Sequence, residues 1–381
     1  MPELFNLIQQ NKKVDKNKLA ILVLWFLVNA FFFIKNGIVT TGEAEKYIGQ
    51  ANIFLQTGSV SSPNLWFYFI ETGLIAFCIK FHASFLIIII IQFILNFAAT
   101  LFFYKTLLFL FDLNSVALAG TIILLLNQPY QEFNTFLQTE SLFYSLTLIL
   151  SCYVIWIEKI SLKKIIIVLA LLLIASITRP TGLLFILPVF LYLFFIYFHK
   201  ASRIKKTGIL LVFGLLLFFI INKAMGSGGE FDFMLPFRDE DIICGLPSIA
   251  HSASIKTTDN GNSILGIFYY VIHNPAQFFR LAWLKTIAFF GLYRSYYSKW
   301  HNIYLIVYFY LIHILAIASL PYLAKKMFYK TAYLLSLIFI TWLTVMLTCD
   351  DWHNRFYLSI SPYIIMISMG ILSRKIKRAY K

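Results

Sequence analysis

Apolar runs of about twenty residues recur along the whole chain, separated by short polar segments. A run of this length crosses the hydrocarbon core of a bilayer as a helix, because a helix satisfies its backbone polar groups internally. The pattern predicts an all-α polytopic membrane protein with about ten spans, forming one integral membrane domain over residues 1–381 with no large soluble domain. The expected spans are residues 19–35, 84–104, 114–128, 137–157, 164–178, 181–198, 205–222, 302–320, 331–348 and 355–373.

Two further apolar stretches, 64–80 and 264–293, are ambiguous by hydropathy alone. Lys and Arg accumulate on the cytoplasmic side of membrane proteins. If neither stretch crosses the membrane, every strongly basic loop and the basic tail fall on the same side as the N-terminus. We therefore expect both stretches to be interfacial or re-entrant helices. They lie in the two long outer segments that this topology predicts, residues 36–83 and 223–301.

The charge distribution supports this topology. The formal net charge is +15, in a chain that is 60% hydrophobic with a mean hydropathy of +0.78. The expected inner segments hold 20 of the Lys and Arg residues with 4 acids, and the expected outer segments hold 12 with 13 acids. The basic character is thus explained by topology and by anionic lipid at the inner face. We expect cytoplasmic N- and C-termini and no nucleic-acid partner.

The four cysteines show no metal-ligand spacing. They are Cys78, Cys152, Cys244 and Cys349. Cys244 and Cys349 both fall on the expected outer side, which permits a disulfide. Buried apolar thiols are the favoured interpretation of this pair.

The outer loop 223–263 is the one sizeable polar segment. Its Gly, Ser and Asn content predicts a mobile, partly ordered loop that could cover a site. The loop contains an acidic run, residues 239–241, which is expected to be solvated.

Ionisable residues gather at the outer ends of the spans, and the span interiors are almost free of them; His313 is the main exception. Ion-coupled transporters usually keep acids or bases near the membrane midplane. A catalyst that works at the outer surface needs its charged groups at span ends. The distribution favours the second arrangement.

The residue types at the outer span ends suit transfer from a lipid-linked phosphate donor. A carboxylate takes a proton from an acceptor hydroxyl, and arginines hold the anionic phosphate. Phosphate is a good leaving group, so a separate general acid is not obligatory. The candidate base is Glu43, with Glu45 as the alternative. The candidate phosphate ligands are Arg179, Arg355, Arg280, Arg294 and His353, and the candidate substrate contacts are Tyr47, Glu140 and Asp351.

Each of these residues also has a purely structural interpretation. Tyr47 is typical of an aromatic anchor at the membrane interface. Arg179 could snorkel or cap a helix end, and Glu140 could cap the span that follows it. An arginine that opens an apolar span needs an anionic partner, which Asp350 or Asp351 could supply to Arg355.

The first outer segment resembles the GT-C superfamily of polytopic glycosyltransferases. It is most similar to the bacterial relatives of protein O-mannosyltransferases and of the lipid A aminoarabinose transferase. Their signature is Asp-Glu, two residues, then Tyr, with an Ala four residues further on. Here Glu43, Tyr47 and Ala51 match in spacing, whereas Ala44 replaces the second acid and Glu45 follows one residue late.

Three shorter motifs extend the resemblance along the chain. They are Thr139-Glu140-Ser141-Leu142, Arg179-Pro180-Thr181-Gly182, and Arg355-Phe356 with the downstream Pro362. The resemblance implies a GT-C fold with surface helices after the first outer loop. It implies an inverting glycosyltransferase of the bacterial inner membrane, with an outward-facing site. The donor would be a polyprenyl-phosphate sugar and the acceptor a hydroxyl of a glycan, lipid or protein.

No cofactor is expected. Some distant members of that superfamily depend on a divalent metal, but the most similar ones do not, so we predict no metal ligands. Three rival functions stay open on the sequence: a polysaccharide polymerase, a flippase or transporter of lipid-linked sugars, and a structural or assembly partner. No Walker loop, Rossmann glycine pattern, zinc spacing or Ser-His-Asp arrangement is present.

Overall fold

The computed structural model describes residues 16–198, 200–226, 228, 231–247, 255–258 and 261–379. Seven helices within these residues are long and apolar enough to cross a membrane. They are α2 (Lys16–Asn36), α5 (Leu86–Phe111), the continuous helical segment η3 (Pro180–Phe185) and α10 (Ile186–Tyr197), α11 (Arg203–Gly226), α15 (Lys299–Lys326), α16 (Phe328–Leu347) and α17 (Arg355–Ala379). The chain is an all-α polytopic membrane protein, as the apolar pattern predicts.

The other three expected spans are also helical but shorter. They are α6 (Asn114–Leu125), α8 (Thr139–Ile155) and α9 (Leu162–Thr178), of 12, 17 and 17 residues. A helix of 12 residues is shorter than the hydrocarbon core requires. The count of ten spans therefore stays a prediction.

Each of the two ambiguous stretches folds as a pair of short helices. Residues 64–80 fall in η1 (Pro63–Tyr68) and α4 (Phe69–Lys80), and residues 264–293 fall in α13 (Ile264–His273) and α14 (Pro275–Gly291). Pro275 lacks a backbone N–H and opens α14, so α13 ends before it. Three of these helices, η1, α4 and α13, are much shorter than a span, whereas α14 has 17 residues, like α8 and α9. Their place in the interface is untested.

The remaining described elements are short or lie in the outer segments. They are α3 (Glu43–Thr57), α7 (Gln128–Glu132), η2 (Phe133–Thr135), α12 (Leu235–Arg238) and the two-stranded antiparallel ribbon of β1 (Asp241–Ile243) and β2 (Leu246–Pro247). The described residues of the loop 223–263 thus include α12 and the ribbon. Residues 227, 229–230, 248–254 and 259–260 of this loop lie outside the described residues, as does the basic N-terminal segment 1–15.

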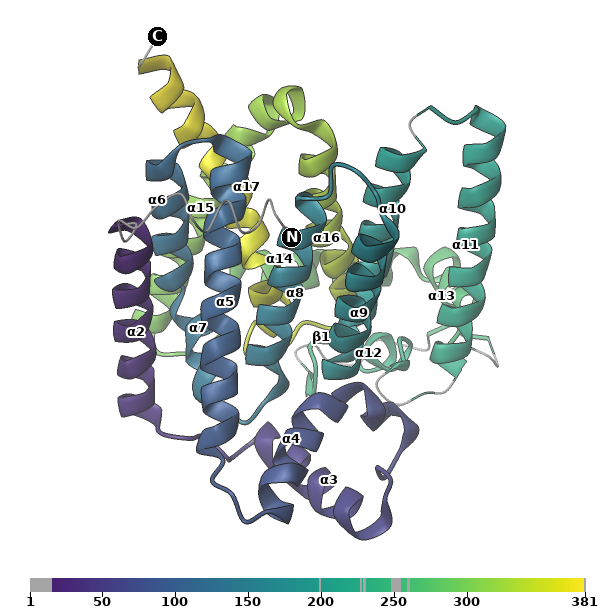
Figure 1. The fold of residues 1–381 in the computed structure, drawn as a ribbon. Coiled ribbons are helices and arrows are strands. Elements are labelled where there is room, and N and C mark those ends of the chain that lie inside the picture. The colour runs from purple at the N-terminus through teal and green to yellow at the C-terminus, as the bar shows by residue number, and fades with distance from the viewer. Residues whose placement is uncertain are drawn as a thin grey trace. The chain divides into compact units, whose positions relative to one another are not determined.

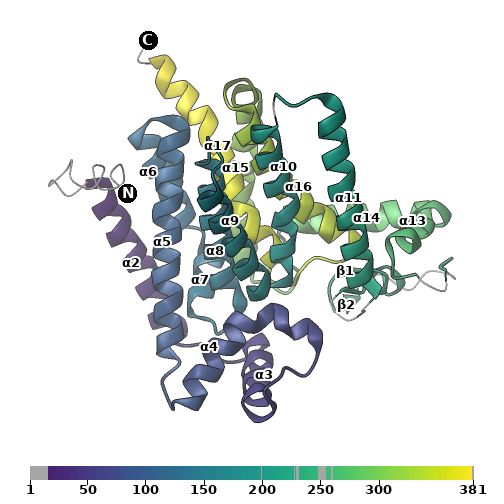
Figure 2. The same ribbon diagram turned by 45° about the vertical axis from the view of Figure 1, so that its right-hand side comes forward.

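The chain divides into two compact units. Unit 1 comprises residues 1–185 and 368–381, and unit 2 comprises residues 186–367. In unit 1 the helices α2, α5, α6, α8 and α9 lie side by side, and α3 packs against α4 at one end of them (Figures 1 and 2). In unit 2, α16 packs against α10, α14 and α15.

Polar side chains join the helices of unit 1. The Trp25 indole donates to Asn96 at 2.8 Å, which connects α2 to α5. Asn134 donates to Asn29 at 2.8 Å and accepts from Ser141 at 2.6 Å, which connects α2 to α8. Hydrogen bonds of this kind hold helices together in a bilayer, where apolar surface alone gives little association between helices.

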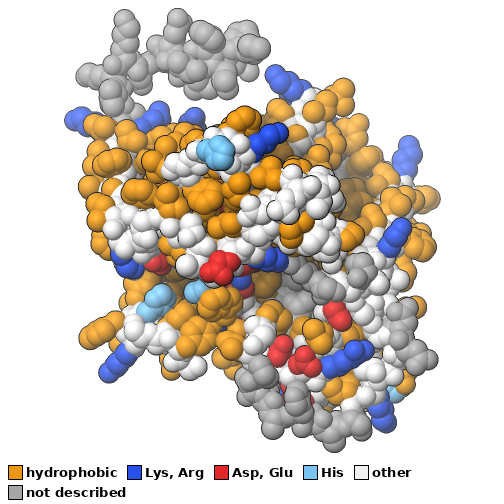
Figure 3. All heavy atoms as spheres, turned by 90° about the horizontal axis from the view of Figure 1, so that it is seen from below, with side chains coloured by type: hydrophobic (Ala, Val, Ile, Leu, Met, Phe, Trp, Pro, Cys, Tyr) orange, Lys and Arg blue, Asp and Glu red, His pale blue; other side chains and the backbone are white. Residues whose placement is uncertain are grey.

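Hydrophobic side chains cover much of the surface seen in Figure 3. The helix α11 is the clearest case among the described elements, with Leu211, Leu215 and Phe219 all more than half exposed. A water-soluble protein rarely exposes such a continuous apolar face. Contact with lipid explains it.

Candidate functional site

The candidate base Glu43 stands at the start of α3. Gly42 precedes it with a positive φ of 68°, a backbone conformation that favours glycine, and Glu43 and Glu45 occupy the first helical turn. Carboxylates are favoured there by the positive end of the helix dipole. The Tyr47 hydroxyl donates to Glu43 Oε1 at 2.8 Å. Glu43 is half-buried and its carboxylate is fixed by this hydrogen bond, whereas Glu45 is exposed.

The buried face of α3 explains why an alanine, Ala44, stands where the glycosyltransferase signature has its second acid. Ala44, Tyr47 and Ala51 are all fully buried and share one hydrophobic cluster, at the spacing of one helix face. An acid at position 44 would therefore be buried in that cluster. Tyr47 packs on Tyr68 with ring centroids 5.6 Å apart, so its ring belongs to the core and is not an exposed interfacial anchor.

Backbone hydrogen bonds tie the first outer segment to the chain that leads into α8. Val39 donates to the Thr135 carbonyl at 2.9 Å, and the Val39 carbonyl accepts from Leu137 at 3.0 Å. Two residues later α8 begins at Thr139, with Glu140 in its first turn. This pairing brings the start of α3 and the start of α8 to the same end of unit 1.

Glu140 is fully buried and forms an ion pair with Arg179, which ends α9. The chain then folds back as η3 directly against the last turn of α9. A Cβ atom at Gly182 would lie 2.5 Å from the Ala175 carbonyl oxygen, so only glycine allows this close approach. The glycine of the Arg-Pro-Thr-Gly motif thus allows the tight turn that follows Arg179.

Electrostatics join these residues into one cluster, which we call the Glu43 cluster: Glu43, Tyr47, Glu140 and Arg179. Burial raises the pKa of Tyr47 well above its usual range, the charge of Glu140 raises it further, and the charge of Arg179 lowers it. The phenol is therefore protonated at neutral pH and able to donate to Glu43. Unit 1 brings together four of the residues that the sequence selects.

One residue of unit 1 has no role in the sequence-based site. Glu71 on α4 is fully buried, and neither of its carboxyl oxygens has a hydrogen-bond partner. Burial raises its pKa well above the usual range, and the charge of Glu140 raises it further. In the sequence, Glu71 marks only a charge in an ambiguous apolar stretch; its burial depends on the packing of α4.

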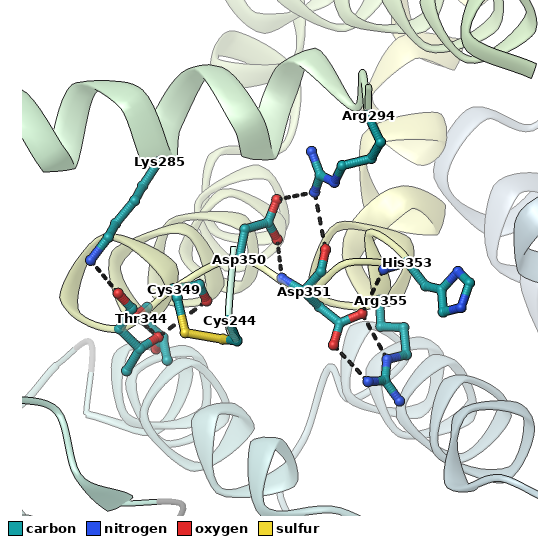
Figure 4. The surroundings of a disulfide bond; sticks show 10 residues. Cys244, Lys285, Arg294, Thr344, Cys349, Asp350, Asp351, His353 and Arg355 are labelled. Carbon is teal, nitrogen blue, oxygen red and sulfur yellow. Dashed lines mark hydrogen bonds and ion pairs between the residues drawn. A yellow bond between two sulfur atoms is a disulfide. The ribbon is translucent and has the colours of Figure 1, made fainter. Parts of the chain in front are cut away.

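The other predicted residues belong to unit 2, where two arginines pair with consecutive aspartates (Figure 4). Arg294 Nη2 lies 2.5 Å from Asp350 Oδ2, with both side chains fully buried. Arg355 binds Asp351 in bidentate fashion, with Nε–Oδ1 and Nη2–Oδ2 distances of 2.8 and 2.7 Å. Arg294 also donates to the Asp351 carbonyl at 3.0 Å. Each arginine therefore has a carboxylate partner.

A disulfide anchors this aspartate segment, so the expectation of two free thiols at Cys244 and Cys349 is wrong. The two residues form a disulfide with Cα atoms 5.1 Å apart. The Cys244 backbone N–H donates to the Asp350 carbonyl, and the Asp350 N–H donates to the Ile242 carbonyl, both at 2.8 Å. The pairing arises because β1 lies beside residue 350, which sequence spacing does not reveal.

The acidic run 239–241 is not simply solvated, contrary to expectation. Glu240 is fully buried, and its carboxylate accepts from Arg280 at 2.9 Å and from Gln277 at 2.8 Å. Asp241 is only 8% exposed. Asp239 is half-buried. Glu240 and Asp241 are buried because α14 packs against β1 and carries Arg280, the partner of Glu240.

Two further groups lie near these pairs in unit 2. Lys285 of α14 is fully buried, donates to the Thr348 carbonyl, and lies 4.3 Å from the centroid of the Phe237 ring. Burial lowers its pKa to about 7. His353 donates its backbone N–H to Asp351 at 2.9 Å, and its ring packs on Trp352 at 4.0 Å. Sequence analysis selects His353 but does not identify Lys285.

His313, the main ionisable residue of the expected span interiors, also has a partner. His313 of α15 and the Tyr357 hydroxyl of α17 lie 2.6 Å apart. In the part of the chain that the structure describes, no group of three or more His, Cys, Asp or Glu side chains is arranged to hold a metal ion. Comparison of the chain with protein-family models, with curated proteins and with solved structures finds no match.

Proposed function

We propose that this protein is an inverting glycosyltransferase of the GT-C type with about ten spans. It moves a sugar from a polyprenyl-phosphate donor to an acceptor hydroxyl of a glycan, lipid or protein at the outer face of the bacterial inner membrane. The observation that carries the proposal is the Glu43 cluster. A half-buried carboxylate is fixed by a tyrosine, beside a buried Glu140–Arg179 pair at the end of a membrane helix bundle.

In the proposed reaction, Glu43 accepts the proton of the acceptor hydroxyl. The hydroxyl oxygen forms a bond to the anomeric carbon while the bond from that carbon to the phosphate oxygen breaks. The electron pair leaves with the polyprenyl phosphate, and the configuration inverts. Tyr47 orients the Glu43 carboxylate by donating to one of its oxygens.

Arginines would stabilise the departing phosphate. In unit 1, which carries the Glu43 cluster, this arginine is Arg179. In unit 2, taken by itself, the phosphate candidates are Arg355 first, then Arg280, Arg294 and His353. Arg280 is the most accessible of the paired arginines described here, with a side chain that is 48% exposed. Arg179 and Arg355 are held by carboxylates, so donor binding would share or replace those partners.

The disulfide is consistent with the proposed outward orientation. Disulfides persist in oxidising compartments such as the bacterial periplasm and are rare in the cytosol. Cys244 and Cys349 both fall in segments that the charge distribution assigns to the outer side. Labelling of single-cysteine reporters in the loops with a membrane-impermeant thiol reagent, in intact cells, tests this orientation.

The reaction itself is tested with the full-length protein in proteoliposomes, supplied with radiolabelled polyprenyl-phosphate sugars and an envelope glycan extract. We expect sugar transfer that falls at least a hundredfold in Glu43→Gln, since a well-placed general base contributes about 10²–10⁴-fold. Glu158→Gln, an exposed acid between α8 and α9, is the matched control and keeps full activity. Full activity of Glu43→Gln together with loss in Glu45→Gln would show the base assignment to be wrong.

The same proteoliposomes separate the enzyme from its main rival. A flippase moves the labelled lipid between leaflets and leaves it chemically unchanged, whereas a transferase releases polyprenyl phosphate. Movement of the lipid without release of polyprenyl phosphate contradicts the proposal.

A further inference from the structure

Glu71 carries a carboxyl group that takes no part in the reaction proposed above. It lies in α4, its side chain is fully buried, and both carboxyl oxygens lack a hydrogen-bond partner. Burial of an ionised carboxylate without a partner costs several kcal/mol even after the surroundings relax. Buried polar groups of native proteins nearly always have partners, so this exception requires an explanation.

The surroundings of Glu71 add a second negative group, Glu140, and among the residues that the structure describes no cation donates a hydrogen bond to Glu71. The charge of Glu140 acts on Glu71, and the charge of Glu71 acts on the Cys78 thiol, about two turns further along α4. Arg179 forms an ion pair with Glu140, and the Lys46 ammonium group lies over the Tyr68 ring, 4.6 Å from its centroid. The charge of a nearby carboxylate makes a second carboxyl group harder to ionise. Glu71 is the one without an ion-pair partner.

Glu71 also lies among the elements that carry the Glu43 cluster. Ile75 and Ala76 of α4 pack in one hydrophobic cluster with Tyr47 and Ala51 of α3. The same helix α4 contacts α8, which carries Glu140, and α9, which ends at Arg179. The Glu71 carboxyl group, which has no hydrogen-bond partner, thus lies near the Glu43 cluster.

We propose that Glu71 is an uncharged carboxylic acid at neutral pH whose hydroxyl donates a hydrogen bond to an oxygen atom of the ligand bound at the Glu43 cluster. The inference rests on the proposed function for the identity of that ligand, a lipid-linked sugar phosphate. Glu71 is a binding and positioning residue and does not itself exchange its proton in the reaction.

A space-filling role and a binding role predict opposite results for an apolar substitution. Replacement of an unsatisfied buried polar group by an apolar group of similar shape is often neutral or stabilising. If Glu71 binds ligand, the same replacement removes the donor and lowers transfer. Stability and activity then change in opposite directions, as they do at sites where function costs stability.

The variants Glu71→Leu and Glu71→Gln test this in full-length protein. We expect Glu71→Leu to melt at or above the temperature of the wild type and to lose transfer more than tenfold. Glu71→Gln keeps the shape and an N–H donor, so its transfer stays within threefold of the wild type. Wild-type transfer in Glu71→Leu overturns the proposal, and so does a loss in Glu71→Gln as large as that in Glu71→Leu.

Infrared difference spectroscopy provides a readout that needs no transferase activity. We expect the wild type to show the carbonyl band of a protonated carboxylic acid that is missing from Glu71→Gln, and polyprenyl phosphate to shift that band. Absence of the band overturns the proposal. If the band is present and shifts but no sugar is transferred, the proposed enzyme function fails while the assignment of Glu71 stands.

Discussion

Arg294 and Asp350 form an ion pair in which both side chains are fully buried, with 2.5 Å between Nη2 and Oδ2. Burial raises the pKa of Asp350, and the Arg294 guanidinium lowers it again. The neighbouring Asp351 holds Arg355 in the same way at the start of α17. Two consecutive aspartates therefore fix two arginines that sequence analysis assigns to phosphate binding.

We expect separate removal of either partner of the first pair to destabilise the protein. Arg294→Met or Asp350→Leu leaves a buried charge without its partner, which costs about 3–5 kcal/mol. The double variant leaves no such charge and is destabilised by less than the sum of the two. Thermal unfolding of the purified proteins in detergent measures all three. Additive effects would show that the two residues do not stabilise each other.

The disulfide should contribute strongly to stability. Cys244 and Cys349 are separated by 105 residues, and a closed loop of about 100 residues is stabilised by roughly 4.7 kcal/mol in the chain-entropy model. We expect the double variant Cys244→Ser/Cys349→Ser, or reduction of the wild type, to lower the unfolding temperature clearly. Reductant should leave the double variant unaffected, because Cys78 and Cys152 are free thiols. An effect of reductant on that variant would contradict the pairing.

Lys285 should make stability depend on pH. Burial lowers its pKa to about 7 in the folded protein, from about 10.4 in an unfolded chain. Between these values the unfolded state binds more protons, so stability rises with pH from about 7 to about 10.4. Below pH 7 the burial penalty is present in full. The helix α14 that carries Lys285 has 17 residues and is not among the seven helices that are long and apolar enough to cross a membrane.

The substitution Lys285→Met isolates this effect from other titrating groups. We expect the variant to be more stable than the wild type at pH 6, with a difference that shrinks as the pH rises toward 10. Thermal unfolding of both proteins over this range measures the difference. A difference that is constant with pH would show that Lys285 titrates normally.

Gly182 should tolerate no side chain. The Cβ atom of Gly182→Ala would lie 2.5 Å from the Ala175 carbonyl oxygen, so η3 must move away from α9. Overpacking of this kind costs about 1–3 kcal/mol, and it displaces Arg179. We expect lower thermal stability and lower sugar transfer. Gly214→Ala is the matched control, because nothing lies within 4 Å of its added Cβ, and it should retain both.

Part of the candidate site follows from local sequence. The spacing of Ala44, Tyr47 and Ala51 defines one face of a helix, and Tyr47 lies one turn after Glu43, within reach of its carboxylate. Their burial and the 2.8 Å hydrogen bond agree with that spacing. Gly182 is different: its requirement arises from the approach of η3 to α9, whereas the Arg-Pro-Thr-Gly motif in the sequence does not show what lies against the glycine.

Charge pairing depends on contacts between distant segments. The run 239–241 has the composition of a solvated loop, yet Glu240 is buried against Arg280, 40 residues further along the chain. Lys285 and Glu71 look like charges that exclude a membrane span, and packing makes them buried groups with shifted pKa values. Burial of a charge depends on what packs over it, which local sequence does not specify.

The sequence by itself determined that this is a helical membrane protein, because the length of an apolar run and the need to satisfy backbone groups in lipid are local properties. It also determined which reactive residues lie at the ends of helices. Only the tertiary structure decided which of the distant ones meet: Glu140 with Arg179, Asp350 with Arg294, and Cys244 with Cys349. Such pairs form between residues far apart in the chain, where the packing of whole helices sets the distances.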